Sequence, residues 1–178
     1  MSAICVYCAS GPVPQRYVDL ATELGTALAA GGHTLVSGGG NISMMGAVAR
    51  ATRAGGGRTV GVIPRALVDR EVADVDADDL VVTDTMRQRK QLMDDRADGF
   101  ITLPGGVGTL EELFETWTAG YLGMHDKPVV LLDAFGFFRP LLDWLEHLRG
   151  DGFVSESALG HLRVTDSVTR AIALSTSR

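Results

Sequence analysis

Short runs rich in valine, isoleucine and leucine recur along this 178-residue chain and alternate with longer segments of helical periodicity. The runs predict six or seven strands, within residues 3–9, 33–38, 58–63, 79–84, 99–104, 128–133 and 161–166. The intervening segments predict helices at Tyr17–Ala30, Ser43–Ala54, Met86–Ala97, Thr109–Leu122 and Phe138–Leu148. Continuous apolar runs are typical of parallel strands covered on both faces. The sequence therefore predicts an α/β fold: a Rossmann-like, doubly wound, mostly parallel sheet with helices on both faces.

Length and composition fit a single domain spanning residues 1–178, since 46% of the residues are hydrophobic and no linker or repeat interrupts the pattern. No stretch approaches the roughly 18 consecutive apolar residues of a membrane span, and the N-terminus lacks the features of a signal peptide. We therefore expect a cytoplasmic protein without a membrane partner. Its net charge of −6, with scattered basic residues, also lacks the footprint of a nucleic-acid groove.

Ligands of such sheets bind outside the carboxyl ends of the strands, so the strand-to-helix junctions are the places to look for function. Four junctions stand out: "CASGP", "SGGGNISMMG", "TDTMRQRK" and "LPGGVGTLEE". Neither glycine-rich junction has a Walker A or G-x-G-x-x-G pattern, so the fingerprints of ATPases and standard dinucleotide enzymes are missing.

The junction "LPGGVGTLEE" places Gly105, Gly106 and Gly108 just before a predicted helix. Glycines let a ligand approach the backbone closely, and unpaired amides at a helix start attract anions. The same glycines also permit a tight turn that packs the helix against the sheet. Glycine spacing alone leaves both interpretations open, a phosphate site or a packing turn.

Arg89 and Lys90 interrupt an apolar helix face that Met86, Met93 and Ala97 form at helical spacing. Basic residues in the first turns also oppose the helix dipole, which favours carboxylates there. A bound anion would remove both conflicts. Alternatively, both side chains extend outward along the edge of the apolar face.

Thr109 and Glu112 have the spacing of a capping box, in which each side chain bonds the other residue's backbone amide. A cap requires only one glutamate, however, and Glu111 adds a second carboxylate beside the predicted phosphate site. A hydrolase acting on a bond near that phosphate would use such a group. Glu112 is therefore either a cap or a catalytic residue.

Cys5 and Cys8 form a C-x-x-C inside the first predicted strand. Positions three apart in a strand point to opposite faces, so we interpret both as buried structural residues rather than a redox or zinc pair. The four histidines show no metal-ligand spacing. We expect neither a metal nor a cofactor.

The junction motifs together resemble the Lonely Guy family of cytokinin-activating phosphoribohydrolases. The family signature P-G-G-x-G-T-x-x-E is met in full by Pro104 to Glu112, and M-x-x-R-K by "MRQRK". The resemblance extends to the G-G-G…M-G turn at Gly38 to Gly46 and to "LGMHDKPVVLL". The chain departs from the family pattern at Ser43, where many relatives have glycine, at Gly11 in "CASG", and in "WTAGYLG".

This resemblance implies a homodimer or larger homo-oligomer that hydrolyses the N-glycosidic bond of N6-modified AMP or of AMP itself. The products would be the free base and ribose 5-phosphate. It implies a phosphate loop at Gly105–Thr109 and a catalytic pair, Arg89 and Glu112. The other residues expected to contact the nucleotide are Ser10, Gly39, Glu71, Met86, Lys90, Gly105, Gly106, Val107, Gly108, Thr109, Glu111 and Thr118.

Two other functions compete with this hypothesis. Related sheet proteins with similar glycine loops carry a nucleotide or cofactor without turning it over, and such a carrier would bind without forming products. An older label for such sequences, lysine decarboxylase, requires a lysine that forms a Schiff base with pyridoxal phosphate. Only Lys90 and Lys127 are available for that role, so this reading has the least support.

Overall fold

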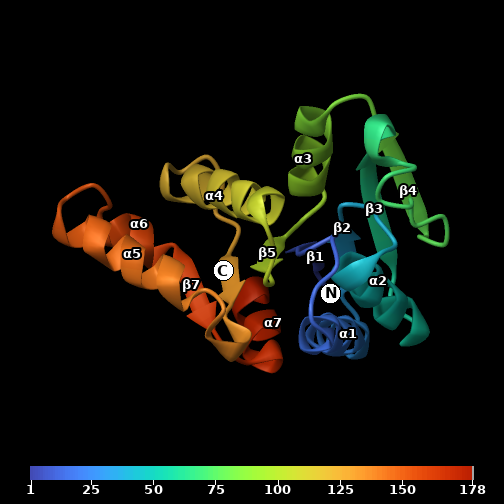
Figure 1. Ribbon diagram of the computed structural model, residues 1–178, viewed down its shortest axis with the longest axis horizontal. Coiled ribbons are helices and arrows are strands. Elements are labelled where there is room, and N and C mark those ends of the chain that lie inside the picture. The colour runs from blue at the N-terminus through green and yellow to red at the C-terminus, as the bar shows by residue number, and fades with distance from the viewer. Residues whose placement is uncertain (178) are drawn as a thin grey trace.

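The computed structural model describes residues 1–177 and contains one seven-stranded sheet in which every strand pair is parallel (Figure 1). The strands are β1 (Ala3–Tyr7), β2 (Thr34–Ser37), β3 (Thr59–Pro64), β4 (Asp79–Thr83), β5 (Gly99–Thr102), β6 (Val129–Leu132) and β7 (Leu162–Thr165). Their order in the sheet is β4-β3-β2-β1-β5-β6-β7. All seven predicted strands are confirmed, as is the α/β class.

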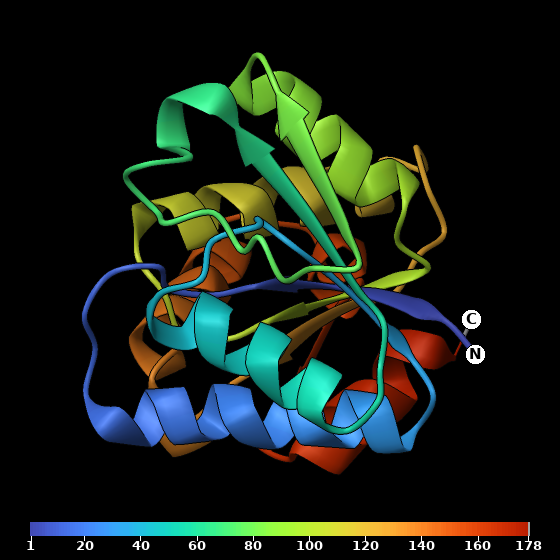
Figure 2. The same cartoon turned by 90° about the vertical axis from the view of Figure 1, so that its right-hand side faces the viewer.

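Seven α-helices cover the sheet: α1 (Gln15–Ala30), α2 (Ser43–Ala54), α3 (Met86–Asp95), α4 (Val107–Tyr121), α5 (Arg139–Gly150), α6 (Glu156–Gly160) and α7 (Val168–Thr176). Helices α1, α2 and α7 share one hydrophobic cluster with one face of the sheet, while α3, α4 and α5 share a second cluster with the other face (Figure 2). Burial on both faces explains why the strands read as continuous apolar runs.

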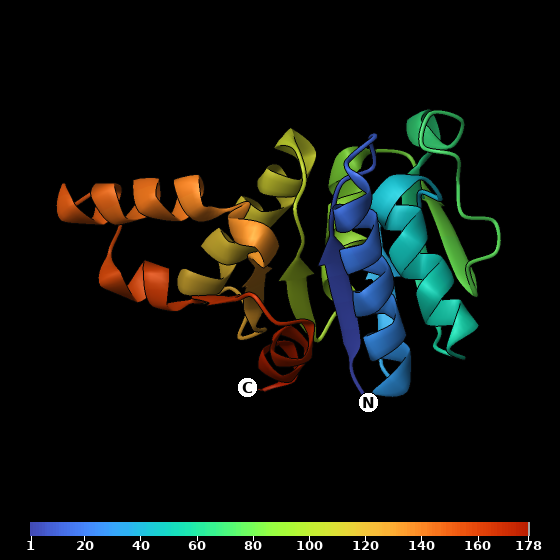
Figure 3. The same ribbon diagram turned by 60° about the horizontal axis from the view of Figure 1, so that its bottom comes forward.

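Helices α1 and α2 lie side by side across their face of the sheet (Figure 3). Leu20, Leu24 and Leu28 recur along α1 at helical spacing and are buried. Gly25 permits the close approach, because a β-carbon there would lie 2.4 Å from the Val48 carbonyl oxygen of α2. This helix packing therefore holds together the β1–α1 and β2–α2 junctions, which lie at the carboxyl ends of their strands.

Several helix boundaries differ from the sequence predictions by one or two residues. Helix α4 begins at Val107, two residues earlier than expected, and α6 and α7 were not predicted. Near the C-terminus, Ser175 is buried in α7 and Arg163 donates hydrogen bonds to Ser177; Arg178 lies outside the described residues. In residues 1–177 there is no helix long and apolar enough to cross a membrane.

Candidate active site

The chain reverses its direction of winding at β1, which lies between β2 and β5. Successive strands are added on one side of β1 as far as β4, and then β5 is added on its other side. The loops that follow β1 and β5 diverge to opposite faces of the sheet and leave a crevice at their carboxyl ends. The site expected from the "CASGP" and "LPGGVGTLEE" junctions lies at this switch point.

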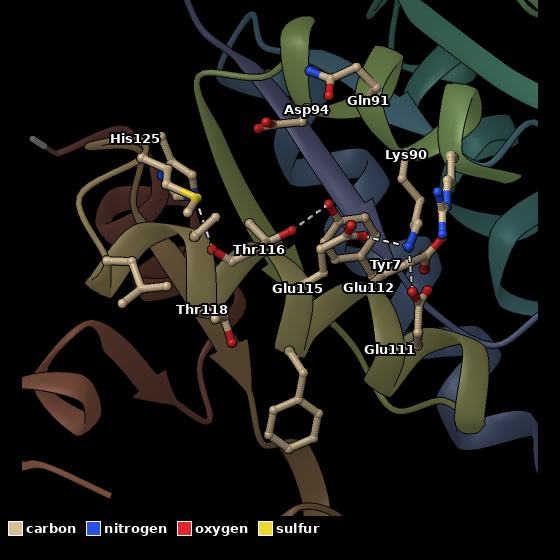
Figure 4. Close-up of a pocket in the computed structure, with 15 residues that line it drawn as sticks. Tyr7, Lys90, Gln91, Asp94, Glu111, Glu112, Glu115, Thr116, Thr118 and His125 are labelled. Atoms are coloured by element: carbon tan, nitrogen blue, oxygen red, sulfur yellow. Dashed lines mark hydrogen bonds and ion pairs between the residues drawn. The ribbon is translucent and has the colours of Figure 1, made fainter.

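Two adjoining cavities occupy this region. The smaller, of about 340 Å³, lies at the carboxyl ends of β1 and β5. It brings together nine of the predicted site residues: Ser10, Glu71, Met86, Arg89, Gly106, Gly108, Thr109, Glu111 and Glu112. The larger, of about 1120 Å³, is an open groove between α3 and α4 (Figure 4). Glu111 and Glu112 line both, so they form the boundary between them.

The glycine turn after β5 leads directly into α4, whose N-cap is Gly106. Gly106 supplies no capping side chain, and the first turn contains no acidic residue. The predicted capping box of Thr109 and Glu112 is therefore wrong, because both residues already lie inside the helix. The first amides of α4 have no intrahelical acceptor, which is the arrangement that attracts anions at helix starts.

The glycines of this turn play two different roles. A β-carbon on Gly106 or Gly108 would meet no atom within 4 Å, so both glycines present open backbone to the smaller cavity. A β-carbon on Gly105 would lie 2.1 Å from Thr109 Oγ1. Gly105 is thus a packing glycine, and the other two leave room for a ligand, which combines both interpretations of the sequence.

Arg89 projects inward from α3 and only 4% of the residue is exposed. Its Nε donates to the Val62 carbonyl at 3.1 Å and Nη2 to the Gly38 carbonyl at 2.9 Å. Nη2 also lies 3.5 Å from Glu71 Oε2. Nη1 donates to no group in residues 1–177, and Arg89 lines the smaller cavity, so two N–H groups remain free for a ligand.

Lys90 takes the other course and lies on the flank of α3. Its ammonium group bridges Glu111 and Glu115 of α4, with Glu115 Oε2 at 2.6 Å (Figure 4). Burial lowers the pKa of Lys90, but the two carboxylates outweigh this and hold its pKa above the ordinary value. The hypothesis that both basic side chains extend outward is therefore wrong for Arg89, which is buried. Lys90 does lie on the flank of α3, but its ion pairs join this helix to α4.

Glu112 lies one turn into α4, on the boundary between the cavities, and its carboxylate accepts no hydrogen bond from residues 1–177. Burial raises the pKa of Glu112 to about 7; the Arg89 guanidinium opposes the rise, whereas Glu111 adds to it. The Glu71 carboxylate also raises the pKa of Glu112, and the Lys90 ammonium lowers it. A carboxylate with a pKa near neutrality can accept a proton from water at physiological pH.

Glu71 reaches the smaller cavity from the loop between β3 and β4. Ser10, at the end of the β1 junction, donates to Glu71 Oε1 at 3.4 Å. Glu71 therefore joins Ser10 to Arg89, and three elements far apart in sequence meet at one carboxylate.

The other predicted site residues lie around this centre. Lys90 and Thr118 line the larger groove, while Gly105 and Val107 lie in the glycine turn but contribute to neither cavity lining. Gly39 also lines neither cavity and packs against β3, where a β-carbon would lie 3.1 Å from the Val62 amide nitrogen. Ser43, which replaces a family glycine, retains a glycine-like φ of 51°.

Sequence reasoning missed residues of the larger groove. Tyr7, at the end of β1, shares a 3.0 Å hydrogen bond with Thr116, and His125 bonds the Thr116 carbonyl. Burial raises the pKa of Tyr7 well above its ordinary value. The only available signal was the position of Tyr7 at a strand end, which does not separate a groove residue from a core residue.

Cys5 and Cys8 are both buried free thiols, and Cys8 also lines the smaller cavity. Burial raises the pKa of each thiol, so neither has thiolate character at neutral pH. In the described chain, no cluster of three His, Cys, Asp or Glu side chains could hold a metal ion.

Known proteins resemble this chain in both sequence and fold. Residues 45–174 match the sequence family described as "Possible lysine decarboxylase". The chain is 57% identical over 169 residues to the cytokinin riboside 5'-monophosphate phosphoribohydrolase of Mycobacterium tuberculosis, which covers 95% of this chain and 90% of that protein. It is 45% identical over 156 residues to the rice (Oryza sativa) enzyme LOG of the same name, covering 87% and 64%.

Among solved structures, the molybdenum cofactor binding protein of Rippkaea orientalis superimposes with a TM-score of 0.74. The match covers 97% of this chain and 93% of that one at 23% sequence identity, so it shows the shared fold alone. The family assignment therefore rests on the sequence identities to the two enzymes, and the structural match adds only the fold. The protein belongs to the sequence family matched by residues 45–174 and to the LOG family of cytokinin riboside 5'-monophosphate phosphoribohydrolases.

Proposed function

We propose that this protein hydrolyses the N-glycosidic bond of cytokinin riboside 5'-monophosphates, and of AMP, to the free base and ribose 5-phosphate. One observation carries the proposal beyond family membership. A glutamate whose pKa is raised to about 7 lies one turn from an uncapped helix N-terminus, in a cavity that it shares with a buried arginine. Phosphate, sugar and water can each meet a matching group there.

The 5'-phosphate binds at the start of α4 in this proposal. The open backbone at Gly106 and Gly108 allows the phosphate oxygens to approach the free amides, and the helix dipole favours the negative charge. Fixing the nucleotide by its phosphate lets binding energy orient the distant reacting bond.

Glu112 faces the ribose and acts on the attacking water. It accepts a proton from water as the oxygen attacks C1', and the bond from C1' to the purine nitrogen breaks with its electrons leaving on the base. The carboxylate also stabilises positive charge that develops on the sugar, as carboxylates do in O-glycosidases. The departing purine takes up one proton from solvent while Glu112 returns the proton it gained from water, so the reaction balances. In this proposal the two free N–H groups of Arg89 Nη1 hold the phosphate or the leaving base.

The base occupies the apolar part of the smaller cavity. Met45 and Met86 line this cavity, and methionine side chains adapt well to flat aromatic rings. At about 340 Å³ the cavity is at the lower end of the range for small-molecule sites, roughly 300–1,000 Å³. An N6 substituent can extend from it toward open space.

The direct test is incubation of the purified protein with AMP and with isopentenyladenosine monophosphate, followed by chromatography. We expect free base and ribose 5-phosphate in equal amounts. Tight binding of either nucleotide with no product would instead support a carrier. Comparing turnover of the two substrates also measures the preference for the N6 substituent.

Decarboxylation of lysine has no suitable residue. A Schiff-base lysine needs a lowered pKa, whereas the pKa of Lys90 is raised by its carboxylate partners. Lys127 is bound to Asp94 at 3.0 Å and to the Asp94 carbonyl at 2.7 Å. Incubation with lysine and pyridoxal phosphate should therefore yield no cadaverine.

We also propose that residues 1–178 act as a single domain within a cytoplasmic homodimer or larger homo-oligomer. Large apolar side chains at the edge of the groove support self-association, since Leu122 is 56% and Met124 74% exposed. The two free thiols are compatible with a reducing compartment. Light scattering after size-exclusion chromatography would give the number of subunits.

A further inference from the structure

The turn after β2 contains three consecutive glycines, Gly38, Gly39 and Gly40, yet none of them lines the substrate cavity. A phosphate loop would leave its glycines open, as Gly106 and Gly108 are. Each glycine of this turn is instead closely packed, and each has a different neighbour. The turn therefore needs an explanation other than ligand binding.

Gly38 has no room for a side chain, although its backbone conformation does not require glycine. Its φ lies outside the left-handed region, so any residue could adopt its backbone. A β-carbon there would lie 2.0 Å from Arg89 Nη2 and 2.9 Å from Cζ, far inside contact distance. The guanidinium of Arg89 thus fills the volume that any side chain at position 38 would need.

The same contact holds the guanidinium in place. Helix α3 lies alongside β3 (Figure 1), and Arg89 reaches from it to two backbone carbonyls on neighbouring elements, those of Gly38 and Val62. These two bonds fix the plane of the guanidinium, while Nη1 donates to no group in residues 1–177 and Arg89 lines the smaller cavity. Since the head of a long side chain moves more easily than the backbone, an added β-carbon would displace Arg89 before it unfolded the turn.

The next two glycines anchor the loop that carries Glu71. The Asp74 amide donates to the Gly39 carbonyl at 2.8 Å, and Asn41 N donates to the Glu71 carbonyl at 3.3 Å. A β-carbon on Gly40 would lie 3.2 Å from that same carbonyl oxygen. The turn is therefore in contact with the guanidinium of Arg89 and with the backbone of the loop that carries Glu71.

We propose that Gly38 is a positioning residue for the hydrolytic reaction, whose missing side chain and backbone carbonyl together seat the Arg89 guanidinium toward the substrate. This inference rests on the hydrolase function proposed above. The glycine triplet is then the support of the catalytic arginine, and the phosphate loop lies only at the α4 junction.

The test is a double-mutant cycle on AMP hydrolysis with Gly38→Ala, Arg89→Ala and the two combined. We expect Gly38→Ala to lower kcat/KM about 100-fold, the effect of misplacing a catalytic group by about 1 Å. The double variant should be no slower than Arg89→Ala alone, because both changes remove the same guanidinium. Losses that multiply would show that Gly38 acts independently of Arg89 and would overturn the inference.

Two further measurements separate positioning from folding. Gly150→Ala is the matched control, since a β-carbon at Gly150 meets nothing within 4 Å, and it should keep full activity. In the pH profile, displacing Arg89 removes a charge that lowers the pKa of Glu112, so the Gly38→Ala profile should shift upward. Glu71, Glu111 and Lys90 also face Glu112 and are unchanged in this variant.

A crystal structure of the Gly38→Ala variant tests the inference without relying on turnover. The expected result is an Arg89 guanidinium displaced from the Gly38 carbonyl in an otherwise unchanged fold. An undisplaced guanidinium would overturn the inference even in an active enzyme. If the unaltered protein releases no base from AMP, the proposed function fails separately, and the crystal structure still decides the role of Gly38.

Discussion

The two glycine turns of this protein look alike in sequence and differ in structure. In the turn after β5, Gly106 and Gly108 have open space where a side chain would be. In the turn after β2, a β-carbon on Gly38 or Gly39 would collide with Arg89 or with β3. The turn after β5 leaves volume free for a ligand, whereas the corresponding volume in the turn after β2 is filled by the protein's own atoms.

This difference shows that a glycine-rich junction does not by itself identify a phosphate site. What matters is whether the space left by the missing β-carbon is already occupied. The open turn and Glu112 are suited to bind and cleave a nucleotide, whereas the packed turn is suited to hold the charged groups around it. The following predictions test that division.

The largest effect is expected from the carboxylate next to the open turn. Glu112→Gln should lower kcat for AMP by about 10²- to 10⁴-fold, because it removes the group that accepts the proton from water. Base release measured by chromatography would show this. Glu146→Gln makes the same chemical change on exposed α5 and should have no effect. Near-normal base release by folded Glu112→Gln protein would remove Glu112 from the chemistry.

Paired alanine substitutions should separate the two turns by stability. Gly39→Ala forces alanine into a φ of +74° against Ile63, which should cost about 1–3 kcal/mol in the free energy of unfolding. Gly106→Ala, with a φ of −93° and free space, should stay within about 0.5 kcal/mol of the unaltered protein. It should instead raise KM for AMP. Urea denaturation gives both free energies, and equal losses would contradict the comparison.

The pH dependence of turnover should follow the ionisation of Glu112. Because its pKa is raised to about 7 in the unliganded protein, kcat/KM for AMP should rise as pH increases through that region and level off above it. The profile of kcat/KM also contains the titration of free AMP near pH 6, so that titration is measured separately and subtracted. A profile flat from pH 5.5 to 8.5 would exclude Glu112 as the base.

Thermal stability should also depend on the ionisation of Glu112, but it should fall as pH rises, whereas turnover should increase. The folded state holds the Glu112 proton up to about pH 7, whereas the unfolded chain loses it near the ordinary pKa of 4.5. Ionised Glu112 therefore destabilises the fold increasingly as pH rises through this window. Glu112→Gln should raise Tm at pH 8, and this gain should shrink toward pH 5. A gain independent of pH would indicate a cause other than the buried charge.

The smallest effect is expected from the ion pairs that join α3 to α4 beside the open turn. Lys90→Met should cost at most about 1 kcal/mol, because Glu111 and Glu115 are half-exposed and water screens the pairs. Its turnover of AMP should fall less than that of Arg89→Ala. A loss as large as that of Arg89→Ala would place Lys90 among the groups that bind the phosphate.

Much of the fold could be predicted from the sequence because strands that are buried on both faces consist of continuous apolar runs. All seven strands were found in this way, and Ser43–Ala54 was predicted to the residue. Helices α6 and α7 were missed because they are short, at five and nine residues, and so give little helical periodicity to read. Tertiary contacts with the sheet, rather than periodicity, stabilise such segments.

The start of α4 shows where local patterns mislead. Thr109 and Glu112 match a capping box in spacing, yet the actual capping box is Thr85 with Gln88, at the start of α3. The glycine turn continues into helical geometry two residues earlier than the threonine signal suggests. A short motif cannot decide between two possible starts, since the observed start at Gly106 has no side-chain cap at all.

The sequence by itself determined the parallel α/β sheet, the positions of its junctions and the family motifs at them, because periodicity and motif spacing are local properties. Only the tertiary structure decided which glycines are open, that Arg89 is seated on the Gly38 and Val62 carbonyls, and that Glu112 is a free carboxylate rather than a cap. Those properties depend on atoms 27 and 51 residues apart along the chain. Burial and charge at a site are set by such distant neighbours, which no local pattern specifies.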